Sequence, residues 1–257
     1  MSISGSGSTT KARASGIGHR PSAATTRCPL PVARCLLPAL CVLLAACPPK
    51  APTVTPAGAF RPSSRAELAE AEARSAPARR EIVRFGWRSD DGSLQLSGNG
   101  AARVAPPDSL RVDMAASLGL GRATVIMAGQ RVEAQPQAVV DRILPDRFAL
   151  WALLGYMKLP AAASTVEKME DGDRIVWRIT DERGRITLFE MRGNVLIGAT
   201  REDQGRTTSA LQLTRDASGI LSRAQLTDFG RSLRIDIEIT GREASEAFAA
   251  DTWSLRP

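Results

Sequence analysis

From Glu81 almost to the end of the chain, polar and apolar residues alternate. The pattern is clearest in 109–114 (Ser-Leu-Arg-Val-Asp-Met) and in 233–240 (Leu-Arg-Ile-Asp-Ile-Glu-Ile-Thr). A period of two is typical of a strand with one buried and one solvated face. A looser alternation predicts further strands over 82–88, 93–104, 122–128, 174–180, 185–191, 194–201, 206–214 and 220–229. Turn-forming stretches such as Asp-Asp-Gly at 90–92 separate these strands, so we expect an antiparallel meander.

One segment ahead of the strands predicts a helix over 65–75. It is rich in Ala, Glu and Arg, which are good helix formers, and Ser64 with Glu67 fits a capping box at its start. Leu68 is its only large apolar residue. We therefore expect a mostly solvated helix that packs only weakly.

A helical period returns in the middle of the chain. It predicts a helix over 137–144 and a second over 146–157, separated at Pro145, which cannot continue the first helix. The second is apolar around most of its circumference and must be covered on more than one side. Many twisted strands with so few helices can curl into an incomplete barrel, whose concave side the 137–157 insert then closes. The predicted fold class is mainly β (α+β): an unclosed antiparallel β-barrel, or half-barrel, with a helical lid and an N-terminal helix before it.

The concave side of such a sheet has the composition of an apolar ligand cavity. We expect its lining to be Leu94, Leu96, Leu110, Val112, Met114, Phe148, Trp151, Leu154, Trp177, Ile235 and Ile237. The alternative is that these residues simply fill a core, because alternation does not distinguish a hollow barrel from a filled one.

A second apolar feature is the loop 116–121 (Ala-Ser-Leu-Gly-Leu-Gly), which joins two predicted strands. Leu118 and Leu120 stand there among small residues, and exposed apolar loop residues often mark contact with a membrane or a protein. We interpret them as a membrane-insertion loop. The alternative is a loop that folds back into the core.

The N-terminal region has the organisation of a secretory signal: basic residues, an apolar run from Leu36 and small residues before Cys47. The ending Leu-Ala-Ala-Cys resembles the lipobox of bacterial lipoproteins. This resemblance implies that residues 1–46 are a lipoprotein signal peptide and that Cys47 carries the lipid, with palmitate among the expected acyl groups. The Pro-rich stretch 47–63 is then an extended tether, and 64–257 is the domain.

Removing the signal peptide changes the charge. The whole chain has 34 Lys and Arg against 27 Asp and Glu, but residues 1–46 hold five of the basic residues and none of the acidic ones, which leaves 29 against 27. A nearly neutral protein does not favour binding to nucleic acid. The one histidine, His19, and three of the four cysteines also lie in 1–46. A domain without His or a free thiol has no Ser-His or Cys-His nucleophile pair and no imidazole or thiolate metal site. This count does not exclude carboxylate-pair chemistry or an oxygen-ligand Ca²⁺ site. We expect no enzyme, no cofactor and no metal.

Several short apolar motifs carry a family resemblance. They are 100–104 (Gly-Ala-Ala-Arg-Val), 107–112 (Pro-Asp-Ser-Leu-Arg-Val), 118–121 (Leu-Gly-Leu-Gly), 125–132 (Val-Ile-Met-Ala-Gly-Gln-Arg-Val) and 150–155 (Leu-Trp-Ala-Leu-Leu-Gly). The chain resembles the LolA/LolB-like lipoprotein-carrier superfamily, most of all its lipid-anchored outer-membrane receptor branch (LolB-like). The resemblance implies a half-barrel with a helical lid, an apolar cavity for acyl chains, and a loop leucine, here Leu118 or Leu120, that helps deliver cargo to the bilayer. The receptor branch carries more Trp and Tyr than this domain, which leaves the cargo undecided.

These observations predict a lipid-anchored outer-membrane protein that faces the periplasm, binds acyl chains in its cavity and helps transfer or insert lipoproteins or lipids. Its expected partners are those acyl chains, the membrane through Cys47, and a periplasmic carrier protein; we expect a monomer. The alternative is a non-catalytic structural or interaction lipoprotein of the envelope, whose concave face is packed or docks a partner. An envelope hydrolase, with Glu167 and Glu170 or Asp171 and Asp173 as a carboxylate pair, is the third possibility.

Overall fold

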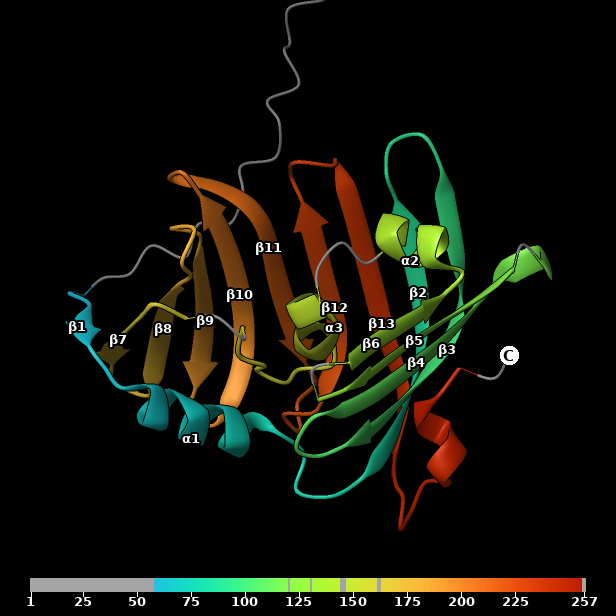
Figure 1. Cartoon of the computed structure of the whole chain (residues 1–257), viewed down its shortest axis with the longest axis horizontal. Helices are drawn as coiled ribbons and strands as arrows, with labels where there is room; N and C mark the ends of the chain where they lie inside the picture. Colours follow the sequence, from blue (N-terminus) through green and yellow to red (C-terminus); the bar gives the residue numbers. More distant parts are fainter. Residues whose placement is uncertain (1–57, 120, 130, 144–146, 161–162, 256–257) are drawn as a thin grey trace, which may run out of the picture. The chain divides into compact units, whose positions relative to one another are not determined.

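One antiparallel sheet of 13 strands dominates the computed structural model, which describes residues 58–119, 121–129, 131–143, 147–160 and 163–255. The strand order is β1-β7-β8-β9-β10-β11-β12-β13-β2-β3-β4-β5-β6 (Figure 1). The strands β1 and β6 are its two edges, so the sheet is unclosed, as predicted. None of the helices within these described ranges has the length and apolar character needed to cross a membrane.

The strands are β1 Arg61–Pro62, β2 Glu81–Asp90, β3 Gln95–Ala105, β4 Ser109–Ala116, β5 Arg122–Ala128, β6 Arg131–Gln135, β7 Thr165–Asp171, β8 Arg174–Thr180, β9 Ile186–Arg192, β10 Val195–Asp203, β11 Arg206–Arg215, β12 Leu221–Asp228 and β13 Leu233–Ala244. The helices are α1 Arg65–Ser75, α2 Gln137–Ile143 and α3 Arg147–Leu153, with 3-10 turns η1 Ser117–Gly119 and η2 Ala250–Trp253. The predicted strands are confirmed to within a few residues at their ends.

Hairpin turns alternate between two ends of the sheet because neighbouring strands are antiparallel. The β2–β3, β4–β5, β8–β9, β10–β11 and β12–β13 turns share one end, which we call the η1 end. The remaining turns share the opposite end, which we call the α1 end. Lys158, which follows α3, lies there, since its Nζ is 2.6 Å from the Glu72 carboxylate of α1 and donates to the Pro107 carbonyl of the β3–β4 turn.

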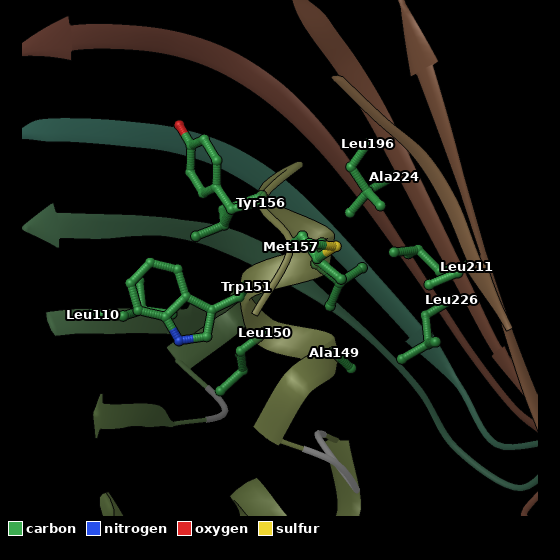
Figure 2. Packing of buried hydrophobic residues seen from close by; sticks show 14 of the residues in the cluster. Leu110, Ala149, Leu150, Trp151, Tyr156, Met157, Leu196, Leu211, Ala224 and Leu226 are labelled. Atoms are coloured by element: carbon green, nitrogen blue, oxygen red, sulfur yellow. The ribbon is translucent and has the colours of Figure 1, made fainter. Parts of the chain in front are cut away.

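The inner face of the sheet and all three helices share one apolar cluster. Every strand except the edges β1 and β6 contributes fully buried residues to it. The helix α3 contacts β10, β11 and β12, and Figure 2 shows it between these strands and Leu110 of β4. Strands far apart in the sheet therefore pack against the same short helix, which requires a strongly curved sheet.

Two glycines of β3 allow the close packing on the inner face. A Cβ at Gly98 would overlap the Ala115 carbonyl oxygen of β4, and one at Gly100 would lie 2.5 Å from ring carbons of Phe85. A larger residue at either position would push neighbouring groups apart. Glycine thus lets the Phe85 ring of β2 lie directly over the backbone of β3.

The outer face of β4 and β5 carries the C-terminal segment with η2. Arg111 Nη1 donates to the Thr252 carbonyl oxygen at 3.0 Å. Ile126 is fully buried but does not belong to the interior cluster, whereas its neighbours Val125 and Met127 do. Because successive strand residues face opposite ways, Ile126 faces this outer layer.

Two predicted helices need correction. The helix expected over 146–157 ends at Leu153, because Gly155 has a φ of +90° and turns the chain away. The helix at 65–75 has the predicted bounds, and Ser64 caps it by accepting from the Glu67 backbone N–H at 3.1 Å. Weak packing was wrong for this helix, since Leu68 is only 1% exposed and lies in the interior cluster.

The strand predictions missed β6, β7 and the two-residue edge strand β1. In β7 the buried residues Val166 and Met169 are three positions apart. Val166 faces the interior, whereas Met169 packs in a small separate cluster with Phe60, on the other face. A strand buried on both faces lacks the alternation on which the predictions depended.

Candidate ligand-binding interior

The centre of the interior is α3 and the turn that follows it. Leu150, Trp151, Leu153 and Leu154 are each at least 94% buried. Figure 2 shows Leu150 and Trp151 between Leu110 of β4 and a group on β10–β12 that includes Leu196, Leu211, Ala224 and Leu226. The helix thus occupies the space where the sequence predicts a cavity.

Most of the predicted lining residues lie in this interior. Those fully buried in its cluster are Leu110, Val112, Met114, Trp151, Leu154, Trp177, Ile235 and Ile237. Leu96 is partly buried against the same cluster. Leu94 differs: it is 42% exposed, because the chain leaves β2 at Asp90 and Leu94 falls in the turn before β3.

Other predicted positions are described only in part or not at all. Phe148 belongs to α3 and Leu118 to η1 at the η1 end of the sheet, but their side chains lie outside the described set. Leu120 and Cys47 lie outside the described residues altogether. The membrane-insertion loop and the lipid anchor therefore remain predictions.

The space left beside α3 is small. A void of about 20 Å³ remains there, lined by Phe85, Trp87, Val112, Met114, Leu150, Leu153, Leu154, Ile235 and Ile237. This is room for about one water molecule. In this structure side chains fill the interior, so an acyl chain can enter only if α3 moves.

Four of the residues around the void were missed as lining. Phe85 and Trp87 belong to the predicted strand 82–88, and their spacing of two residues carried the signal. Leu150 and Leu153 lie on the predicted lid helix and were recognised as apolar without being assigned to the lining. The hydrophobic pattern was therefore sufficient to find all four.

A partly buried polar cluster of Arg242, Glu81 and Tyr156 holds the turn after α3. Arg242 of β13 donates from Nη2 to the Leu154 carbonyl oxygen at 2.8 Å and from Nη1 to the Glu81 carboxylate at 2.7 Å. The same Nη1 donates to Tyr156 Oη at 2.5 Å, and the Tyr156 hydroxyl in turn donates to Glu81. Burial, only partly offset by the positive charge of Arg242, raises the pKa of Tyr156 above its ordinary value. The phenol therefore stays protonated and remains a donor.

The helix α1 supplies further polar contacts just beyond this turn. The Met157 N–H donates to Ser75 Oγ at 3.0 Å, and the Leu159 N–H donates to a Glu72 carboxylate oxygen at 3.1 Å. Lys158 pairs with the same carboxylate. The chain from 154 to 159 is thus fixed by hydrogen bonds at the α1 end of the sheet.

The helix itself is held differently. Within the described part of the chain, no hydrogen bond or ion pair joins a side chain of α3 to the sheet, and the buried indole N–H of Trp151 has no acceptor. The described side chains of α3, from Ala149 to Leu153, make apolar contacts, apart from the Lys158 ammonium 5.6 Å from the Trp151 ring centre. Among the described side chains, a segment fixed by polar bonds therefore adjoins a helix that packs through apolar contacts.

A recess on the outer surface has a different character. It has a volume of about 770 Å³ and lies on the outer face between β3–β5 and the C-terminal segment. Burial alone would raise the pKa of Asp113 in this recess, but hydrogen bonds from Arg111 and Thr124 outweigh it and lower the pKa. Arg103 also pairs with Asp113. The recess is thus polar and internally paired, unlike the apolar interior.

The carboxylates weighed for a hydrolase are engaged elsewhere or exposed. Glu167 pairs with Arg178, Glu170 with Lys168, and Asp171 is exposed in the last position of β7. Across the described ranges no group of three His, Cys, Asp or Glu residues is arranged to hold a metal ion.

Comparison with known proteins found no matching family model and no similar curated protein. Among solved structures, the chain is similar to a domain named as an outer membrane lipoprotein-sorting protein from Vibrio parahaemolyticus, with 8% identity, a TM-score of 0.47, and coverage of 72% of this chain and 94% of that one. It is also similar to a LolA superfamily protein from Nitrosomonas europaea, with 8% identity, a TM-score of 0.47, and coverage of 75% and 98%. LolA superfamily proteins are thus among its structural neighbours. A DUF1329 family protein from Desulfovibrio piger is a third, with 10% identity, a TM-score of 0.41, and coverage of 73% and 95%.

Replacing Arg242 by Gln should destabilise the protein by about 1–3 kcal/mol in urea denaturation, because it leaves the Glu81 carboxylate and the Leu154 carbonyl without their charged donor. Arg234→Gln is the matched control, since Arg234 is more than half exposed and pairs with Asp236 at the surface. We expect that control to change stability by less than about 0.5 kcal/mol. Equal effects of the two substitutions would show that the polar group does not hold the turn.

Proposed function

We propose that this protein is a lipid-anchored outer-membrane protein that faces the periplasm and binds acyl chains in its interior, with α3 as a displaceable plug. In this proposal it helps transfer or insert lipoproteins or lipids. A periplasmic carrier protein delivers the cargo, and the receptor branch of the superfamily is the closest functional parallel.

The observation that carries the proposal is the contrast between α3 and the segment after it. The interior is one continuous apolar cluster, and α3 fills its centre without a described polar bond to the sheet. Among the described side chains, hydrogen bonds to the sheet begin at Leu154, at one end of the helix. A helix held in this way can swing outward about its fixed end and expose an apolar surface of the right chemistry for an acyl chain.

The interior gains a similar free energy from burying an acyl chain and from burying the side chains of α3. Burying the dodecyl chain of a fatty acid contributes about 9 kcal/mol, at about 0.8 kcal/mol for each CH₂. Removing the α3 side chains Leu150, Trp151 and Leu153 from the interior costs about 5–9 kcal/mol, at about 1.5–3 kcal/mol for each side chain. Because these values nearly balance, exchange of helix for ligand would be reversible, as a carrier requires.

The small void favours a second candidate function. A space of about 20 Å³ is what a permanently packed core leaves. In that case the protein would be a non-catalytic structural or interaction lipoprotein of the envelope. The two candidates differ in whether the interior opens, and the next experiment measures this.

Leu153→Ala should increase the affinity for dodecanol by about tenfold or more, because it lowers the cost of displacing α3. Ile126→Ala is the matched control: it removes an equally buried side chain outside the interior cluster. Both should lose about 2–5 kcal/mol of stability. Tryptophan fluorescence reports the binding, since Trp87, Trp151 and Trp177 are all in the interior.

The measurement should use the full chain with Cys47→Ser, so that no attached lipid competes. A single Leu→Ala void is too small for a dodecyl chain, so binding requires α3 to move. If neither the parent chain nor Leu153→Ala binds dodecanol, the interior is a permanent core and the structural candidate replaces the carrier.

The lipid anchor has its own test. Metabolic labelling with palmitate in a bacterial host should label the wild-type chain and not Cys47→Ser, and the labelled chain should fractionate with the outer membrane. Replacing any of Cys28, Cys35 or Cys41 should leave the labelling unchanged, because these lie in the segment expected to be removed. An unlabelled wild-type chain would contradict the anchor.

The membrane-insertion loop is tested by transfer. Replacing Leu118 and Leu120 together by Ala should slow transfer of a bound acyl ligand to liposomes several-fold, while the affinity for the ligand stays the same. Ile220→Ala is a suitable control, because Ile220 is 53% exposed in the β11–β12 turn at the opposite end of the sheet. If transfer slows only in Ile220→Ala, the α1 end of the sheet contacts the membrane and the assignment of the 116–121 loop is wrong.

A further inference from the structure

Two arginines from different strands meet the turn that follows α3. Arg242 of β13 donates to the Leu154 carbonyl oxygen at 2.8 Å. Arg215 of β11 reaches the next residue, since its Nη2 lies 3.5 Å from the position that a Cβ on Gly155 would take. Both guanidinium groups therefore lie beside Leu154, which also lines the small apolar void.

The positive charge of this pair is only half balanced. Arg242 has the Glu81 carboxylate as its partner. Arg215 donates to the carbonyl oxygens of Gly219 and Leu196, both at 3.1 Å, and among the described residues it forms no ion pair with a carboxylate. Burial, followed by the charge of Arg242, lowers the pKa of Arg215 below its ordinary value. An additional anion at this position would relieve both effects.

Unused hydrogen-bond donors are present at the same place. The Nε–H groups of Arg215 and Arg242 are buried and have no acceptor among the described residues. Most buried donors in proteins have a partner, so two unpaired guanidinium donors on arginines that meet at one turn require an explanation. Charged acceptors such as carboxylate or phosphate oxygens form the strongest hydrogen bonds with arginine.

We propose that Arg215 and Arg242 bind the anionic headgroup, a carboxylate or a phosphate, of an amphiphile whose chain occupies the interior in place of α3. This inference rests on the proposed function and adds the chemical class of the ligand. The headgroup lies at the α1 end of the sheet, beside the 154–155 turn. The chain runs from there past Leu154 into the apolar interior.

The test compares two ligands with the same chain, dodecanoate and dodecanol, on the full chain with Cys47→Ser. We expect dodecanoate to bind about tenfold more tightly, because only its carboxylate forms charge-assisted bonds to the pair. Arg215→Gln should remove this preference, because it weakens the binding of dodecanoate about tenfold more than that of dodecanol. Arg223→Gln is the matched control: Arg223 lies exposed on the neighbouring strand, paired with Asp236, and its replacement should keep the preference.

A variant with an intermediate effect strengthens the comparison. Arg215→Lys keeps the charge but loses the forked geometry, so it should retain part of the preference. Thermal melting of each variant shows whether it is folded. The wild-type comparison decides the question even where a variant does not fold.

The possible outcomes separate this inference from the proposed function. Equal binding of dodecanoate and dodecanol by the wild-type chain overturns the headgroup site and leaves acyl binding intact. Binding of neither ligand, including to Leu153→Ala, overturns the proposed function and this inference with it. Inorganic phosphate alone is the third comparison. If it raises the melting temperature as much as dodecanoate does, and Arg215→Gln loses this effect, the two arginines bind a free anion and the headgroup assignment is overturned.

Discussion

The structure depends on covering the apolar inner face of an unclosed sheet. That face extends over eleven of the thirteen strands, and α3 is the element packed at its centre, between β4 and β10–β12. A flat sheet of this size would leave most of the face in water, so curvature and the helix are needed together. Any ligand that binds the same face must compete with α3 for it. In the proposed function, ligand binding therefore depends on the stability of that one helix in its place.

The sequence predicts most of the strands because each buries one face only. In β4 and β13 the buried residues fall on every second position, and this is the pattern that period-two analysis detects. Period-two analysis fails at β7, where Met169 packs on the opposite face from Val166. Phe60, which directly precedes β1, covers Met169 on that face. Period-two analysis also fails at β6 because this edge strand has no fully buried residue. The failure at β7 comes from a contact with a distant segment and that at β6 from its place at the sheet edge, and local periodicity contains neither.

The candidate site also has a part that the sequence predicts and a part that it does not. Its apolar lining was largely predictable, since alternation assigns a face to each residue of a strand; Leu94 was wrong because the alternation continues past the end of the strand into a turn. Its polar part was not predictable. Glu81 and Arg242 are 161 residues apart and meet through the pairing of β2 with β13, whose register shifts between Ile239 and Gly241. A one-residue error in that register would put Arg242 on the other face.

In the proposed function, the polar part also determines how α3 is exchanged for a ligand. Arg242 is fixed by Glu81, Tyr156 and the Leu154 carbonyl, and Arg215 by two further backbone carbonyls. None of these bonds has to break for α3 to leave the interior, since they begin where the helix ends. Both guanidinium groups are thus already oriented before a ligand arrives, and binding an anion there costs little additional side-chain entropy. The same residues that keep one end of the helix in place would then also keep the headgroup of its competitor at the rim of the interior.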